Sequence, residues 1–212
     1  MTVLISDPPL RVVFQNIRWQ TYEYILADLG DRPVRLTYDR GELEIMSPSK
    51  SHEWFGCLVG RMIETLTLER GIPIQSVKST TWRSALKQRG LEADESYYIQ
   101  SEPRVRGKLE FDPGVDPVPD LVVEIEISRS VLDRLGIYAA LGIREIWRYD
   151  GEKLTAHVLD AEGGYREVET SAALPALRVR DLERFLQRAT LTDETSLMRE
   201  FLVWVRDRRP AP

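Results

Sequence analysis

Three acidic residues lie within one short apolar stretch near the middle of the sequence. Asp120, Glu124 and Glu126 interrupt a run of Leu, Val and Ile that has the composition of a buried β-strand. Strand side chains alternate between two faces, so the three carboxylates share one face while the aliphatic residues between them point into a core. Burying unpaired carboxylates is costly, so this acidic face needs cations, hydrogen-bond donors or a solvent cleft.

Two kinds of partner satisfy that requirement, and this stretch alone leaves both open. A divalent metal ion held by the carboxylates would make the face a catalytic centre. Arginine side chains paired with the carboxylates would make it a structural network, since ion-pair networks perturb acidic groups in the same way.

Further acidic residues lie on other strand candidates earlier in the chain. Glu44 belongs to an alternating segment, and Asp94 lies at the start of a strand that covers residues 96–99. Carboxylates from neighbouring strands can converge on a hard cation such as Mg²⁺, which takes oxygen ligands and keeps waters for chemistry. The pattern therefore indicates metal-assisted phosphodiester hydrolysis, in which the metal activates a water and clamps the phosphate.

The composition limits the classes of protein that the chain can be. With 212 residues, 42% of them hydrophobic, it suits one globular domain with its own core. A net charge of −5 argues against a general nucleic-acid binder, so a nucleic-acid substrate would need a local basic patch or metal ions. The single cysteine, Cys57, excludes an internal disulfide and a cysteine-based zinc site, and it fits a cytoplasmic protein. No signal peptide and no membrane span are expected.

Hydrophobic periodicity predicts the elements that would position the acidic side chains. After a loose arm over residues 1–10, the first half should hold a helix, a β-hairpin, a long helix and short strands. The expected ranges are 21–29 for the first helix, capped by Thr21, 34–38 and 42–46 for the hairpin, 50–70 for the long helix, and 74–78, 80–83 and 96–99 for strands. The buried stripe of the long helix should comprise Phe55, Leu58, Val59, Met62, Ile63 and Leu66.

The second half should place the acidic strand beside a helix and further strands. The expected ranges are 100–117 for a loop, 120–127 for the central strand, 130–141 for a helix capped by Ser130, 144–149, 153–159 and 165–168 for strands, and 180–188 and 193–208 for two tail helices. This order predicts a fold of the broad α/β class, in an α+β arrangement with a mixed sheet flanked by helices. Residues 1–180 would form one domain with its core at about 34–160, and residues 181–212 a helical extension packed on it.

Four segments, taken in order, carry a family pattern. They are 41–48 (GELEIMSP) followed by His52, then 92–99 (EADESYYI), 119–125 (PDLVVEI) and 138–147 (YAALGIREIW). The set resembles the PD-(D/E)xK nuclease superfamily and, more closely, a bacterial family of restriction-endonuclease-like proteins long classed as a domain of unknown function. The resemblance covers roughly residues 15–180. It implies a restriction-endonuclease-like core with an N-terminal helix and hairpin and a C-terminal helical tail.

The resemblance also implies roles for individual residues. Asp94 would be the metal-binding Asp of the second core strand, and Glu124 would be the acidic residue of the E-x-K element. Glu44, Asp120 and Glu126 would assist them, with Asp120 as a third metal ligand. The cation would be Mg²⁺ or Mn²⁺, the substrate would be a nucleic acid, most simply DNA, and the analogy allows a homodimer.

The chain departs from the family pattern at two positions. Ala93 stands where a Pro usually precedes the Asp, which changes a backbone preference but no chemistry. Glu126 stands in place of the Lys of E-x-K, which normally orients the attacking water and neutralises developing charge. Three outcomes are open: a basic residue (candidates Lys78, Arg83 and Lys108) takes over, Glu126 adds a second metal ligand, or activity is lost.

Each candidate residue also has a structural interpretation. Asp120 can cap the start of its strand, and Glu126 can pair with an arginine. Glu44 can face solvent on a hairpin edge. His52 lies in the first turn of the long helix, where capping and packing are favoured over a catalytic role.

The sequence thus supports two hypotheses. The first is a Mg²⁺-dependent endonuclease that hydrolyses phosphodiester bonds with metal-activated water. The second is a catalytically weak or inactive module on the same fold that acts in binding or assembly. A hydrolase of another class built on Glu44 and His52 is disfavoured, because no nucleophile elbow is present.

Overall fold

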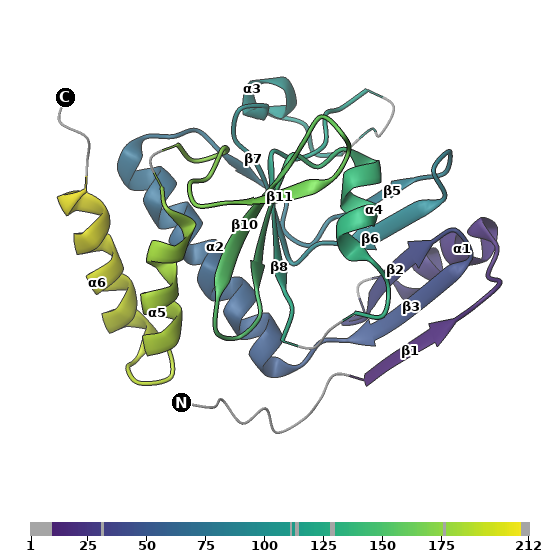
Figure 1. The fold of residues 1–212 in the computed structure, drawn as a ribbon, viewed down its shortest axis with the longest axis horizontal. Helices are drawn as coiled ribbons and strands as arrows, with labels where there is room; N and C mark the ends of the chain where they lie inside the picture. Colours follow the sequence, from purple (N-terminus) through teal and green to yellow (C-terminus); the bar gives the residue numbers. More distant parts are fainter. Residues whose placement is uncertain are drawn as a thin grey trace.

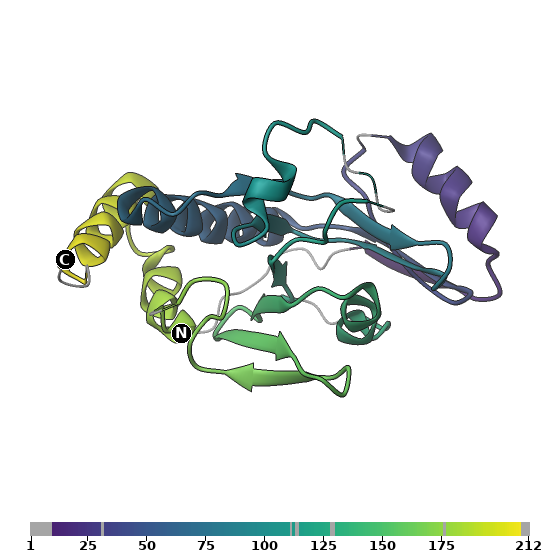
Figure 2. The ribbon, with the colours of Figure 1, turned by 90° about the horizontal axis from the view of Figure 1, so that it is seen from above.

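The strands of the protein form two sheets, with helices packed on their faces (Figures 1 and 2). The sequence predicted one mixed sheet, and the structure divides the strands because the N-terminal hairpin builds a sheet of its own. The computed structural model describes residues 10–30, 32–110, 112, 115–127, 130–175 and 177–208.

The first sheet has five strands in the order β1-β3-β2-β6-β5, and all of its neighbours are antiparallel. The expected hairpin at its centre is confirmed. Its strands are β1 (Leu10–Phe14), β2 (Arg35–Asp39), β3 (Glu42–Ser47), β5 (Thr81–Ser84) and β6 (Arg89–Glu92).

The second sheet has six strands in the order β11-β10-β9-β8-β7-β4. Only the β8–β9 pair is parallel, so the chain must cross over between these two strands, and a helix makes this crossover. The strands are β4 (Gln75–Ser76), β7 (Glu95–Tyr98), β8 (Leu121–Ile125), β9 (Glu145–Tyr149), β10 (Leu154–Leu159) and β11 (Tyr165–Val168).

Helices lie on both faces of the sheets. They are α1 (Trp19–Leu29), α2 (Lys50–Arg70), α3 (Glu102–Val105), α4 (Arg134–Leu141), the 3₁₀ helix η1 (Val179–Leu182), α5 (Glu183–Arg188) and α6 (Glu194–Asp207). Helix α4 is the crossover between β8 and β9, and it also packs against β5 and β6 of the first sheet. It therefore joins the two sheets at the acidic strand.

Helix α2 has the predicted bounds, because its end signals are local in the sequence. The Ser49 side chain caps it by accepting from the His52 N–H at 3.3 Å. Gly71 ends it in the left-handed region, at φ 64°, where a residue without a Cβ is favoured. All six residues of the expected stripe are at most 3% exposed, so α2 covers its sheet as predicted.

The two faces of β8 alternate as the sequence predicts. Leu121, Val123 and Ile125 pack into the core that contains α2. Val122 packs into a separate core with residues of α4. Because Glu124 follows the same alternation, its carboxylate lies on the side of α4.

Three elements have no counterpart in the sequence prediction. Strand β1 replaces the end of the expected arm, whose residues 1–9 lie outside the described residues. Strand β6, with Gly90 at its centre, forms because β2 and β5 pair with it on either side. Helix α3 is a single turn inside the expected loop.

Helices α1 and α4 begin at other residues than expected. Helix α1 begins at Trp19, and Arg18 rather than Thr21 precedes it, without a side-chain cap. Helix α4 begins at Arg134 with Asp133 as its cap, whose carboxylate accepts from the Gly136 N–H at 3.0 Å. Ser130 does not cap α4, because its hydroxyl donates to a carboxylate of the first sheet.

The two tail helices pack against α2 (Figure 1). Leu197, Phe201 and Val205 of α6 are fully buried in the core that α2 covers. A hydrogen bond of 2.7 Å from Trp54 Nε1 to Glu194 also ties the start of α6 to α2. The division into one domain plus an extension stays a prediction.

Candidate functional site

A small cavity lies where the first sheet meets β8, α2 and α4. Its volume is about 20 Å³, and charged side chains dominate its walls. The lining residues are Arg11, Arg35, Glu44, Met46, His52, Glu92, Asp94, Glu124, Ile125, Glu126, Ser130 and Arg134. Five of the six candidate residues from the sequence are in this set, and Asp120 is the exception.

Asp94 is held against the end of β8 by the backbone. It lies between β6 and β7, and its N–H donates to the carbonyl of Val123 at 3.3 Å. Its Oδ2 accepts from the Ile125 N–H at 2.7 Å. Burial raises the pKa of Asp94, and the positive charges of His52 and Arg35 only partly offset this.

Glu124 lies on β8 and meets two side chains of α4. Arg134 donates from Nε to Oε2 at 2.9 Å and from Nη2 to Oε1 at 2.7 Å, and the Tyr138 hydroxyl also donates to Oε1. Burial raises the pKa of Glu124; Arg134 opposes this rise, and the charge of Asp94 adds to it. Asp94 and Glu124 are thus close enough to repel each other, although thirty positions separate them in the chain.

Arg134 is the basic residue that sequence reasoning missed. Besides Glu124, it donates to Thr37 Oγ1 at 2.7 Å and to the carbonyl of Glu92 at 2.9 Å, so it joins both sheets. Burial alone would lower its pKa, but Glu124, Tyr138 and Asp94 together outweigh burial and the pKa is raised. The signal in the sequence is its spacing: Arg134 and Tyr138 are four residues apart on one helix face, directly after the acidic strand.

The three basic candidates for the missing Lys lie elsewhere. Lys78 pairs with Glu64 at 3.1 Å and with Glu95 at 3.4 Å. Lys108 pairs with Asp116 in another part of the molecule. Neither these two nor Arg83 lines the cavity, because strand and helix packing brings arginines there instead.

Arg35 is a second cation that the sequence did not single out. It lies on β2 and donates to Glu92, and its Nη2 donates to Glu53 Oε1 at 3.1 Å. The same nitrogen lies 3.9 Å from Oδ1 of Asp94. Arg35 therefore supplies positive charge to three carboxylates at once.

Glu44 is buried, not exposed on a hairpin edge. Its Oε2 pairs with Arg11 of β1 at 2.8 Å and accepts from the Val131 N–H at 3.1 Å. The Ser130 hydroxyl donates to both of its oxygens at 3.0 Å. Strand β1 and the segment before α4 cover this part of β3, so Glu44 joins three parts of the chain.

His52 and Glu126 also line the cavity. The backbone of His52 takes part in capping α2, while its Nε2 lies 3.4 Å from Asp94 Oδ2. Burial lowers the pKa of His52, but Glu53 and Asp94 more than compensate, so the pKa is raised. Glu126 pairs with Arg148 of β9, which confirms the arginine pairing weighed for it.

Asp120 is not part of the cavity. It precedes β8, at the end opposite to Glu124, and its Oδ2 accepts from the N–H groups of Ile99 and Ser101 at 2.7 and 2.8 Å. The Ser101 hydroxyl donates to its Oδ1 at 2.9 Å. The structure therefore places Asp120 away from the site, as an acceptor for the turn after β7.

A comparison with protein families identifies the family to which the chain belongs. A family model described as "Uma2: Putative restriction endonuclease" matches residues 19–194. The chain belongs to the Uma2 family. No curated protein matches it. The match includes every lining residue of the cavity except Arg11, and it agrees with the restriction-endonuclease-like fold expected from the sequence.

The lining of this Uma2 cavity fits a divalent cation in charge and donor chemistry. Apart from Glu126, which pairs with Arg148, it carries four carboxylates and three guanidinium groups. Arg35 is also shared with Glu53 outside the cavity, so the carboxylates outnumber the guanidinium groups. Carboxylate oxygens are the ligands that Mg²⁺ takes in proteins.

The same residues limit how the Uma2 chain could hold a cation. In the part of the chain that the structure describes, no three acidic, His or Cys side chains are grouped to hold a metal. Two carboxylates of the lining, such as Asp94 and Glu124, could hold a cation only with water in its other positions, as is common for Mg²⁺. Among the described helices, none is both long and apolar enough to cross a bilayer.

Proposed function

We propose that this Uma2 protein is an endonuclease that hydrolyses phosphodiester bonds of DNA with Mg²⁺ or Mn²⁺ at Asp94 and Glu124. One observation carries the proposal. Two carboxylates from separate strand ends line one cavity, and each has a raised pKa because it is buried. Buried carboxylates with perturbed pKa values are typical of functional sites.

The side chains around the pair have separate tasks. A bound Mg²⁺ or Mn²⁺ supplies a Lewis acid that lowers the pKa of water and offsets negative charge on a phosphate. Arg134 orients Glu124 through its two hydrogen bonds and provides the positive charge that the Lys of E-x-K would provide. It cannot act as a base, because a guanidinium stays protonated.

His52 and Arg35 complete the electrostatics of the site. The His52 ring lies beside Asp94 and can hold a proton there. Arg35 pairs with Glu92 and Glu53 and lies 3.9 Å from Asp94, so it offsets part of the negative charge of all three carboxylates. Glu44 has a structural task, since its contacts hold β1 and the segment before α4 in place.

Cleavage assays with plasmid DNA, single-stranded DNA and RNA in Mg²⁺, Mn²⁺ or EDTA test this function. We expect cleavage that needs the metal and falls at least about 100-fold in Asp94→Asn and Glu124→Gln, because each change removes a metal ligand. Glu162→Gln, at an exposed site away from the cavity, is the matched control and should cleave as the wild type does. Absence of cleavage with every substrate and metal, or full activity in Asp94→Asn, would contradict the proposal.

A non-catalytic module is the second candidate, and one observation favours it. Arg134 and Tyr138 already engage both oxygens of Glu124, so this carboxylate is neutralised without a cation. Calorimetric titration with Mn²⁺ separates the two candidates. A folded protein that neither binds Mn²⁺ nor cleaves nucleic acid would identify the module, whereas Mn²⁺ binding that Asp94→Asn abolishes would support the nuclease.

A further inference from the structure

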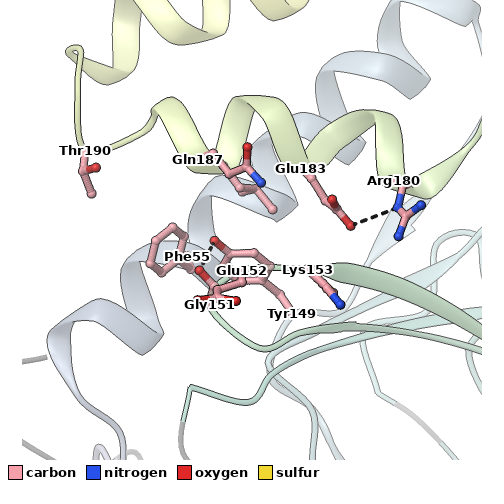
Figure 3. A pocket seen from close by; sticks show the side chains of 10 residues that line it. Phe55, Tyr149, Gly151, Glu152, Lys153, Arg180, Glu183, Gln187 and Thr190 are labelled. Atoms are coloured by element: carbon pink, nitrogen blue, oxygen red, sulfur yellow. Dashed lines mark hydrogen bonds and ion pairs between the residues drawn. The ribbon is translucent and has the colours of Figure 1, made fainter. Parts of the chain in front are cut away.

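A pocket of about 520 Å³ lies between α2, the β9–β10 turn and the η1–α5 segment (Figure 3). Phe55 and Tyr149 of its lining are 3% and 1% exposed, so their rings belong to the core and offer no free face to a ligand. Glu183 lies 3.8 Å from Arg180 Nε in the same lining, so positive charge there is offset. A clearer binding surface is the edge of the first sheet.

Strand β1 forms this edge, and one of its faces is apolar and exposed. Among the described strands it pairs with β3 alone, and Figure 1 shows it at the outside of its sheet. Leu10, Val12 and Phe14 alternate along it and are 73%, 42% and 45% exposed. Proteins usually protect such an edge with Lys, Pro or a bulge, because its unpaired backbone groups can pair with another strand. The five residues of β1 include neither Lys nor Pro.

The exposed side chains of β1 continue an apolar row that α1 covers further inside the sheet. Val12 and Phe14 are the register partners of Ile45 and Leu43 on β3, so these four side chains share a face. Leu43 is fully buried in a core with residues of α1, and Ile45 is partly buried against it. Helix α1 thus covers β3 more completely than β1, and an apolar partner would bury the rest of the row.

A second copy of β1 matches this edge residue by residue. Two copies paired antiparallel about Val12 would place Val12 opposite itself and Leu10 opposite Phe14 of the other copy. Every cross-strand pair on the exposed face is then apolar. Arg11 would lie opposite Val13 on the other face, where Glu44 already pairs with its guanidinium at 2.8 Å, so no like charges would be directly opposed.

The charges beside the two ends of β1 also favour a second copy. Near the N-terminal end of β1, β3 leads to the exposed Lys50 at the start of α2. Near the C-terminal end, β3 begins with the exposed Glu42, and the adjoining Asp39–Arg40 pair is neutral as a whole. Antiparallel pairing brings opposite ends together. The basic end of each copy would therefore approach the acidic end of the other.

We propose that the chain forms a two-fold homodimer in which the β1 edges of two copies pair and join their five-stranded sheets into one. The contact uses one short strand from each copy, so it belongs with small interfaces, and we expect a dissociation constant of about 1–100 μM. The two-fold axis of an antiparallel pair is perpendicular to the sheet. Both cavities, which β1 reaches through Arg11, would therefore lie on one face of the joined sheet.

Sedimentation equilibrium of the full chain, without metal or nucleic acid, tests the dimer independently of the proposed function. The wild type should pass from monomer to dimer between about 1 and 500 μM. Val12→Lys would set two ammonium groups opposite each other at the two-fold axis, so it should weaken the dimer at least about ten-fold. Val203→Lys is the matched control, because Val203 is exposed on α6, far from β1 in Figure 1, and it should dimerise as the wild type does.

A charge pair tests the register. Leu10→Lys and Phe14→Glu should each weaken the dimer, whereas the variant that combines them should recover most of the affinity, because each Lys would then face a Glu of the other copy. Circular dichroism checks that every variant is folded. A wild type that stays monomeric at the highest concentration, or a Val12→Lys protein that dimerises equally well, would overturn the proposal. Failure of the combined variant to recover affinity would overturn the pairing about Val12.

Discussion

The guanidinium of Arg134 and the carboxylate of Glu124 are both buried, and each is the other's main source of opposite charge. Removing one member of a buried pair leaves the other uncompensated, which usually costs several kcal/mol. We therefore expect Arg134→Met to lower the free energy of unfolding by about 3–5 kcal/mol. Urea denaturation followed by circular dichroism measures this change.

Two companion variants show whether the loss comes from the pair. Arg134→Lys keeps the charge but not the forked geometry, so it should lose less stability than Arg134→Met. Glu124→Gln combined with Arg134→Met should recover part of the loss, because no buried charge remains unpaired. A double variant that is as unstable as the sum of its single variants would contradict the pairing argument.

The Glu53 carboxyl should make the stability of the fold depend on pH in the acid range. His52, and then Arg35, lower the pKa of this carboxyl to about 2 from an ordinary 4.5, against the effect of partial burial. A carboxyl whose pKa is lower in the folded state stabilises the fold above pH 4.5, and this contribution disappears as the pH falls towards 2. Glu53→Gln should therefore be less stable than the wild type at pH 6, and the difference should shrink by pH 2.5.

Urea unfolding of both proteins across this pH range provides the measurement. Lys50→Gln, an exposed change on the same helix turn, serves as the control for a general charge effect. A difference between Glu53→Gln and the wild type that stays constant down to pH 2.5 would show that the pKa of Glu53 is not lowered.

At the scale of elements, α2 carries two interior glycines with different surroundings. A Cβ added at Gly56 would meet Ile125 at 3.7 Å and Asp94 at 3.9 Å, which are ordinary contacts. A Cβ added at Gly60 would lie 3.0 Å from the Glu95 carboxyl and from the Tyr97 hydroxyl. These two groups are hydrogen-bonded to each other and buried, so they have little room to move.

Alanine at these two positions should therefore change the free energy of unfolding in opposite directions. Gly56→Ala should raise the free energy of unfolding by about 0.5–1 kcal/mol, the usual gain from Gly to Ala inside a helix. Gly60→Ala should lose stability, because the crowding at Glu95 and Tyr97 outweighs that gain. Thermal unfolding of the two variants beside the wild type gives the comparison, and a Gly60→Ala protein as stable as Gly56→Ala would contradict it.

The hairpin and α2 show how far local sequence specifies an element. Alternation around the turn at 39–41 gave the hairpin, and Ser49, Gly71 and the apolar stripe gave the bounds of α2. Strand β6 and helix α4 show the limit. Strand β6 has no sequence pattern of its own and forms because β2 and β5 pair with it on either side. Helix α4 starts later than predicted because the Ser130 hydroxyl binds Glu44 instead of capping the helix.

At the scale of the whole molecule, α6 and α2 share one core. Phe201 is fully buried there, and its ring meets Phe185 of α5 edge-on at 5.1 Å. Phe201→Ala should cost about 3–5 kcal/mol, the usual loss for a buried aromatic residue. If residues 181–212 fold together with the rest, the whole chain should unfold at a lower urea concentration in one transition.

Tryptophan fluorescence and far-ultraviolet circular dichroism should then give the same midpoint for this variant. Arg199→Ala, at an exposed position of the same helix, should stay within about 0.5 kcal/mol of the wild type. Two separate transitions in Phe201→Ala would show that the tail unfolds by itself.

The sequence by itself determined what depends on neighbours along the chain: the bounds of α2, the hairpin, and the two faces of β8 that separate Glu124 from its aliphatic neighbours. These follow from periodicity and capping, which act over a few residues. Only the tertiary structure decided which charges meet. The crossover from β8 through α4 places Arg134 on Glu124, β2 brings Arg35 to Asp94, and the turn after β7 takes Asp120 away from them. Such meetings depend on long-range pairing and packing, for which no local pattern exists.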